Sequence, residues 1–171
     1  GIVDVAKEQV ESGAHVLDVC VALTERADEA EQMSRIVKLL SMSVEAPIMI
    51  DSTEASVIEA ALEHIPGRAI INSINMENGR ERIDRVVPIA KKHGAALVAL
   101  TIDQAGMAKT RERKLEVARA IYDIVVGEYG MRAEDLIYDD LTFTLATGDQ
   151  EWVDSAIETI EGIRLIKREL P

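Results

Sequence analysis

Residues 48–74 (IMIDSTEASVIEAALEHIPGRAIINSI) decide the fold of this chain. An apolar run at 48–51 is followed by a helical pattern at 54–64, a Pro-Gly pair and a second apolar run at 69–74. Proline and glycine end helices, and two parallel strands need a long crossover connection, which is usually a helix. The stretch therefore predicts a strand–helix–strand unit of an α/β fold.

The same alternation continues on both sides of this unit. The predicted strands cover residues 15–21, 48–51, 69–74, 95–102 and 136–139. The predicted helices cover residues 2–12, 28–42, 54–64, about 80–93, 110–129 and 149–168, and residues 103–109 are expected to form a loop. Because the strands are nearly continuous apolar runs, we expect them to be parallel and buried on both faces.

Two architectures fit this alternation: an open doubly wound sheet and part of a (β/α)8 barrel. The first strand is not followed by the Gly-x-Gly-x-x-Gly fingerprint of dinucleotide-binding open sheets. A full barrel takes about 250 residues, or about 31 per unit. At that rate 171 residues hold five to six units, so a barrel would be incomplete in this chain.

The composition limits the class of partner. The chain has 19 Lys and Arg against 31 Asp and Glu, a net charge of −12, which argues against nucleic acid and anionic membranes. The sequence has neither a long apolar run nor a signal-peptide pattern, and its one cysteine fits a reducing compartment, so we expect a cytoplasmic protein. Cys20 is predicted to be a small buried thiol. No metal site is predicted.

Polar residues recur at or near the carboxyl ends of the predicted strands. They are Asp18, Asp51, Asn72, Asp103 and Asp139. In parallel α/β folds these ends converge on one face, where carboxylates and a carboxamide can bind a flat heterocycle that carries N–H donors and a carbonyl. The alternative is that they only form turns or caps; after Asp51, either Ser52 or Thr53 is a candidate cap for the next helix. Asn72 lies inside an apolar strand, where it needs a specific partner.

Five segments in order carry a family resemblance. They are MIDSTE (49–54), AIINSINMENG (69–79), HGAALVALTID (93–103), GMAKTRERKLEVARAIYD (106–123) and LTFTLATGD (141–149). Together they resemble the methyltetrahydrofolate:corrinoid methyltransferase family, which includes the pterin-binding domain of cobalamin-dependent methionine synthase. The resemblance runs over essentially the whole chain.

The resemblance implies a (β/α)8 TIM barrel of the dihydropteroate synthase-like type. Residues 1–171 would form the central part of this pterin-binding barrel domain, with about five strand–helix units and with the first and last strands outside the chain. The domain would bind 5-methyltetrahydrofolate and pass its N5 methyl group to Co(I) of a corrinoid, the cobalamin carried by another domain or protein, as in methionine synthesis. The open edges of a partial barrel would also favour self-association.

The resemblance also assigns roles to residues. Asp51, Asn72 and Asp139 match pterin-binding positions and are the predicted catalytic residues. The predicted binding set further includes Asp18, Ser52, Asn75 and Asp103. The family usually has Asp-Pro where this chain has Asp139-Asp140.

Two alternative functions stay open. The first is a dihydropteroate synthase-like enzyme, although those enzymes usually have Asn-Asp where this chain has Asn72-Ser73. The second is a non-catalytic folate-binding or structural fragment, and we expect the isolated chain to be inactive in methyl transfer. The basic run at 109–114 is predicted to be a solvated helix face, with contact to the glutamate tail of a folate as the alternative.

Overall fold

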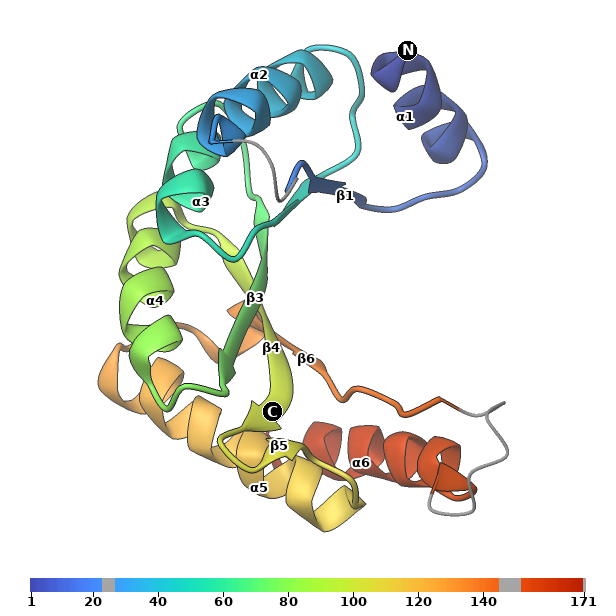
Figure 1. Ribbon diagram of the computed structural model, residues 1–171, viewed down its shortest axis with the longest axis vertical. Coiled ribbons are helices and arrows are strands. Elements are labelled where there is room, and N and C mark those ends of the chain that lie inside the picture. Colours follow the sequence, from blue (N-terminus) through green and yellow to red (C-terminus); the bar gives the residue numbers. More distant parts are fainter. Residues whose placement is uncertain (23–26, 145–151, 171) are drawn as a thin grey trace. The chain divides into compact units, whose positions relative to one another are not determined.

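The computed structural model describes residues 1–22, 27–144 and 152–170, and the chain divides into two compact units (Figure 1). The first unit contains Gly1–Ser73 and Pro88–Leu97. The second contains Ile74–Val87 and Val98–Pro171. Strand β3 (Ile70–Met76), helix α4 (Glu81–His93) and strand β4 (Ala96–Asp103) contribute residues to both.

The first unit is a parallel sheet covered by helices on one face. Its remaining elements are α1 (Ile2–Glu11), β1 (Leu17–Cys20), α2 (Glu29–Ser41), β2 (Ile48–Asp51) and α3 (Ala55–Leu62). Strand β2 lies between β1 and β3 and pairs in parallel with both. Helices α2 and α3 pack side by side (Figure 1). The predicted parallel α/β arrangement is therefore present in this unit.

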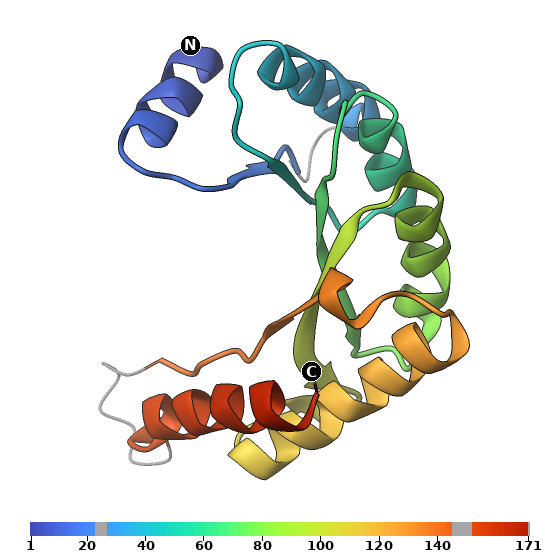
Figure 2. The ribbon, with the colours of Figure 1, turned by 180° about the vertical axis from the view of Figure 1, so that it is seen from behind.

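The second unit is built around the carboxyl-terminal part of β4. Its remaining elements are β5 (Gly106–Met107), α5 (Arg111–Tyr122), a π-helical turn (Asp123–Glu128), a 3-10 turn (Ala133–Asp135), β6 (Leu136–Asp139) and α6 (Ser155–Glu169). Both β5 and β6 pair with β4. Helices α5 and α6 lie alongside each other in both ribbon views (Figures 1 and 2).

The strands of the first unit are buried on one face more than on the other. Leu17 and Val19 of β1 are buried, whereas Asp18 and Cys20, between and after them, are exposed. Successive side chains of a strand point to opposite faces, so one face of β1 packs on helices and the other does not. The prediction that the strands are buried on both faces is therefore wrong for β1. The prediction of a buried thiol at Cys20 is wrong for the same reason.

A short hairpin replaces part of the predicted loop at 103–109. Gly106 and Met107 form β5, which runs antiparallel to β4 with Asp103 opposite Gly106. Gly106 has a φ of +97°, a backbone conformation that glycine adopts without steric cost. Two residues are too few to show a strand period in the sequence, which is why the hairpin was not predicted.

The helices agree with the predicted ones in their cores and differ at their ends. Helix α5 begins after Thr110, whose Oγ1 accepts a hydrogen bond from the Arg113 N–H at 3.3 Å, and its last predicted turn is π-helical. Helix α6 begins at Ser155, and residues 149–151 of the predicted helix lie outside the described residues. Across the described part of the chain, no helix combines the length and the apolar character that a membrane crossing requires.

Candidate functional site

Three predicted site residues meet on the exposed face of the sheet in the first unit. In the register of the parallel strands, Asp51 lies opposite Cys20 on one side and opposite Asn72 on the other. Asp18 precedes Cys20 by two residues and so points to the same face. Ile50 and Ile71, on the other face, are fully buried. The structure thus brings Asp18, Asp51 and Asn72 together from three neighbouring strands.

The members of this cluster influence one another electrostatically. The pKa of Asp18 is raised, mainly by partial burial of its carboxyl group and next by the negative charge of Asp51. A hydrogen bond with the Asn72 side chain acts in the opposite direction. Two carboxyl groups that repel each other across neighbouring strands favour a ligand that brings N–H donors or positive charge. Asp18 is therefore the candidate for the specific partner that an amide inside an apolar strand requires.

Ser52 connects this cluster to the surrounding elements. Its side chain is only 3% exposed, and its Oγ donates to Oε1 of Glu29 at 2.7 Å and accepts from the Glu54 N–H at 3.1 Å. Its backbone N–H donates to the carbonyl of Asn72 at 3.3 Å. The residue that caps α3 is Glu54, so the prediction that Ser52 or Thr53 caps this helix is wrong. Ser52 instead bonds to the first turn of α2.

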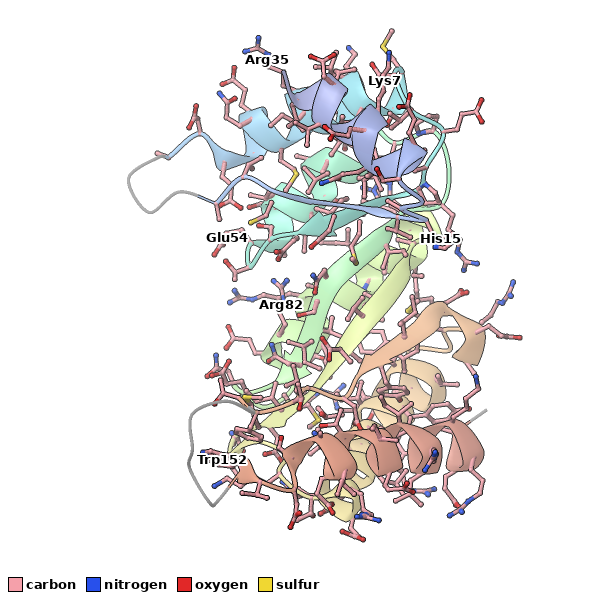
Figure 3. All side chains as sticks on the ribbon, turned by 90° about the vertical axis from the view of Figure 1, so that its right-hand side faces the viewer. Lys7, His15, Arg35, Glu54, Arg82 and Trp152 are labelled. Carbon is pink, nitrogen blue, oxygen red and sulfur yellow. The ribbon has the colours of Figure 1, made fainter. Side chains whose placement is uncertain are left out.

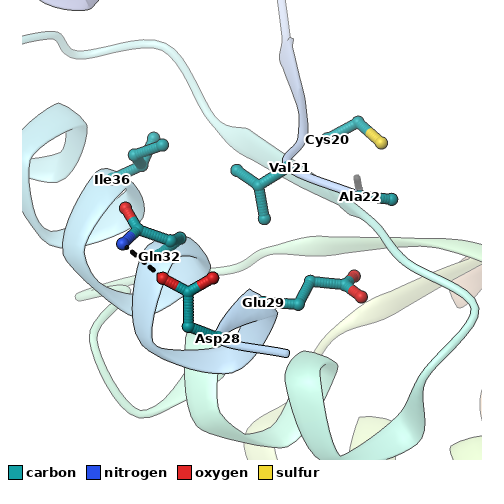
Figure 4. A pocket seen from close by; sticks show the side chains of 7 residues that line it. All are labelled: Cys20, Val21, Ala22, Asp28, Glu29, Gln32 and Ile36. Carbon is teal, nitrogen blue, oxygen red and sulfur yellow. Dashed lines mark hydrogen bonds between the residues drawn. The ribbon is translucent and has the colours of Figure 1, made fainter. Parts of the chain in front are cut away.

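A cavity of about 290 Å³ lies between the end of β1 and the start of α2 (Figure 4). Its lining residues are Cys20, Val21, Ala22, Asp28, Glu29, Gln32 and Ile36. Asp28 accepts a hydrogen bond from the Gln32 amide at 3.0 Å. Because Glu29 both lines the cavity and holds Ser52, the cavity adjoins the carboxyl end of β2. Glu29 is not among the predicted site residues, because an acidic residue in the first turn of a helix is usually explained by the helix dipole.

The other three predicted site residues lie in the second unit, each at the end of a strand or near it. In each of them, one side-chain oxygen accepts a hydrogen bond from the backbone N–H two residues later. The pairs are Asn75 with Glu77 at 3.0 Å, Asp103 with Ala105 at 3.0 Å and Asp139 with Leu141 at 2.9 Å. These are Asx turns, in which the side chain fixes the loop that follows it. The turn role considered as an alternative for Asp103 and Asp139 is therefore present, and Asn75 forms the same kind of turn.

The basic run at 109–114 is largely engaged in contacts. Arg113 pairs with Asp103, and Arg111 donates from Nε and Nη2 to the Glu158 carboxylate, the shorter distance being 2.5 Å. Lys109 Nζ lies 4.5 Å from the ring centroid of Trp152. Trp152 precedes α6 and is labelled in Figure 3. The prediction of a solvated face holds for Lys109, Thr110 and Glu112, which are exposed, and is wrong for Lys114.

Lys114 departs furthest from the predicted solvated face. Its side chain is 1% exposed, and its Nζ donates to the backbone carbonyls of Asp140 and Leu141, the latter at 2.7 Å. The signal for its burial was present in the sequence. Lys114 shares a helical face with Val117 and Ile121, at spacings of three and seven residues, and both are buried.

Asp140 is a second buried charged group beside Lys114. It is 3% exposed, and among the described residues neither of its carboxyl oxygens has a hydrogen-bond partner. Burial raises its pKa to about 6, while the Lys114 charge lowers it and the Asp139 charge raises it further. Gly162 of α6 makes room for this group, because a Cβ atom there would collide with the Asp140 carboxyl and lie 2.8 Å from Cδ of Lys114.

Comparison with known proteins gives the family. A family model described as pterin binding enzyme matches residues 1–171. The chain is 43% identical to methionine synthase of Mycobacterium tuberculosis and 42% identical to methionine synthase of Mycobacterium leprae, over 98% of its own length in both cases. It spans only 14% of the length of each of these relatives.

Comparison with solved structures gives the fold. The crystal structure of 7,8-dihydropteroate synthase from Vibrio fischeri ES114 matches 98% of this chain and 64% of that chain, with a TM-score of 0.66 and 15% sequence identity. The predicted dihydropteroate synthase-like TIM-barrel fold, present in part, is therefore confirmed. The family resemblance is confirmed as well, because the family model covers the whole chain. The chain belongs to the pterin binding enzyme family.

Proposed function

We propose that this chain binds 5-methyltetrahydrofolate and acts as the methyltransferase domain that passes the N5 methyl group to Co(I) of a corrinoid. The family membership and the identity of 42–43% to methionine synthases support a folate substrate. The corrinoid would be carried by another domain or protein, since the chain matches only 14% of the length of those relatives. We also propose a cytoplasmic location, which is supported by the single cysteine.

The observation that carries the proposal is the meeting of Asp18, Asp51 and Asn72 on one exposed face. Asp51 and Asn72 are direct neighbours in the strand register, and Asn72 interacts with Asp18. The edge of a pterin ring presents several N–H donors and one carbonyl. Two carboxyl groups accept from N–H donors, and a carboxamide can both donate and accept. The residues present therefore fit a pterin ring.

These side chains also suit the chemistry of methyl transfer. When bound, methyltetrahydrofolate supplies the methyl group on N5, and breaking the N5–methyl bond leaves N5 with an electron pair that a proton or a strong hydrogen bond must stabilise. Carboxylates around the ring favour its positively charged form. The pKa of Asp18 is raised, mainly by partial burial and next by the charge of Asp51, as expected for a carboxyl group placed beside a second carboxyl group.

Of the remaining predicted site residues, Asp139 keeps the pterin-binding role that the family resemblance implies, and the others keep proposed roles in shaping the binding loops. The Asp139 side chain is exposed at the end of β6 and so is open to a ligand. Asn75 and Asp103 hold the loops after β3 and β4 through their turn hydrogen bonds. Ser52 ties the end of β2 to Glu29. We expect substitutions of Asn75, Asp103 or Ser52 to change the positions of these loops.

Calorimetric titration of 5-methyltetrahydrofolate into the whole chain and into Asp51→Asn tests the proposal. We expect saturable binding that the substitution weakens at least about tenfold, as expected for a hydrogen bond to a charged acceptor. Asp4→Asn is the matched control, because it makes the same chemical change on an exposed side chain of α1. Equal affinities for Asp51→Asn and wild type would refute the assigned site. A folded wild-type chain that does not bind would refute the proposal for this chain.

A further inference from the structure

A buried lysine of α5 forms hydrogen bonds to the turn that follows β6. Lys114 of α5 is 1% exposed and points its Nζ at two consecutive backbone carbonyls, those of Asp140 and Leu141. An ammonium group is buried only at a high cost unless its protons are bonded. Its pKa is lowered by burial, while the charges of Asp140, Asp139 and Glu158 act in the opposite direction. The hydrogen bonds of the Lys114 ammonium group therefore go to the backbone of this one turn.

The backbone of Leu141 connects Lys114 to the Asp139 side chain through hydrogen bonds. Its backbone N–H donates to Oδ1 of Asp139 at 2.9 Å. Its carbonyl accepts from Lys114 Nζ at 2.7 Å and lies 3.0 Å from Thr159 Oγ1 of α6, whose single hydroxyl proton is shared with the Ser155 carbonyl at 2.9 Å. One peptide unit on each side of Leu141 is therefore bonded, one to the site carboxylate and the other to two side chains of the supporting helices.

The backbone of Leu141 needs this support. Its φ of 50° lies in the left-handed region, which a leucine rarely adopts because its Cβ then crowds the following carbonyl oxygen. Such a conformation persists where the surrounding structure holds it in place. Without the bonds to its carbonyl, the turn is free to relax toward an ordinary conformation. The N–H that now points at Asp139 would then point elsewhere.

We propose that Lys114 and Thr159 are positioning residues for the Asp139 carboxylate and act through the backbone of Leu141. Neither residue contacts the ligand in this scheme. The inference rests on the proposed function only in taking Asp139 as a pterin ligand. Its structural part, that the two side chains fix the Asp139–Leu141 turn, stands by itself.

Thr159→Val gives the sharpest test, because it removes one hydroxyl donor at nearly constant volume. In the NMR spectrum of the whole chain, we expect the Leu141 amide proton to shift upfield and to exchange faster with solvent, because its bond to Asp139 is weakened. We expect the affinity for 5-methyltetrahydrofolate to fall about three- to tenfold, the range of one lost neutral hydrogen bond. Thr159→Ser, which keeps the hydroxyl, should restore both measurements.

A double-mutant cycle separates positioning from general stability. In an Asp139→Asn background, Thr159→Val should cause little further loss of affinity, because its effect passes through the Asp139 carboxylate. A merely structural role would give additive losses instead and would overturn the proposal. Lys114→Met should shift the same Leu141 amide, and if it does not fold, the Thr159 variants still decide.

The two measurements also distinguish the two proposals. An unchanged Leu141 amide in folded Thr159→Val would refute the positioning role whatever the ligand is. A shifted amide in a chain that does not bind 5-methyltetrahydrofolate would support the turn anchor and refute the proposed function.

Discussion

Replacing Asp140 by asparagine is expected to stabilise the protein at neutral pH. The Asp140 side chain is 3% exposed, and its two carboxyl oxygens have no hydrogen-bond partner among the described residues. Burial is the main reason that its pKa is raised to about 6. Asparagine has nearly the same shape and carries no charge. The substitution therefore removes the charge and leaves the packing against Gly162 nearly unchanged.

The magnitude follows from the pKa of Asp140 in the folded and unfolded chain. An unfolded aspartate has a pKa of about 3.9, so the folded state, with a pKa of about 6, binds the proton more tightly. The stabilising effect of that proton is complete below about pH 4 and is lost as the pH rises through about 6. A difference of about two pKa units corresponds to about 3 kcal/mol. Above pH 7, this value is the upper limit of the increase in unfolding free energy that we expect for Asp140→Asn.

Urea unfolding at pH 4, 6 and 8, followed by circular dichroism, measures this gain. The difference in unfolding free energy between Asp140→Asn and wild type should be near zero at pH 4 and should grow toward pH 8. Asp123→Asn is the matched control, since it makes the same change on an exposed side chain of the π-helical turn, where about ±0.5 kcal/mol is expected. A variant less stable than wild type at pH 8 would refute the reasoning, because it would mean that the ionised carboxyl group is stabilised where it lies.

Two further substitutions test the contacts of α6. Gly162→Ala should destabilise the protein by about 1–3 kcal/mol, because the added methyl group overlaps buried atoms, although alanine normally favours a helix. Gly127→Ala, where a Cβ meets nothing within 4 Å, should not destabilise it, and equal melting temperatures for the two variants would contradict the packing argument. Glu158→Gln should cost about 1 kcal/mol at pH 7 by removing the ion pair with Arg111. The pKa of Glu158 is lowered to about 2, so this stabilisation exists above about pH 4.3 and disappears as the pH falls toward 2; a cost that persists in urea melts at pH 2 would argue against it.

Short apolar strands with clear ends were predictable from the sequence. The bounds of β2 and β6 match the predicted ranges 48–51 and 136–139. Both strands end in an aspartate, and β2 also follows Pro47, so turn-forming residues mark where pairing stops. The gathering of Asp18, Asp51 and Asn72 was predictable as well. It depends only on parallel strands whose ends lie at the same edge.

Features that depend on one particular pairing partner were not predictable. Strand β5 exists because β4 pairs with it, and its two residues have no period of their own. The bond between Ser52 and Glu29 joins residues 23 positions apart, and neither residue type requires the other. The prediction that Lys114 is solvated was wrong because the local composition and the helical spacing predicted opposite environments for it. Four basic residues among six suggested a solvated face, whereas the spacing to Val117 and Ile121 placed Lys114 on the buried one.

The pair Asp139-Asp140 shows how two identical residues in sequence take opposite roles. Asp139 is exposed and holds the turn that we assign to the ligand, whereas Asp140 is buried between α5 and α6. Lys114 bonds to the backbone carbonyl at position 140, not to a feature of its side chain. The family that this chain resembles usually has a proline at this position, and the backbone carbonyl of a proline could accept the same hydrogen bond from Lys114. The anchor of the turn is therefore compatible with either residue, and the buried carboxyl group, with the space left for it by Gly162, is the added feature of this chain.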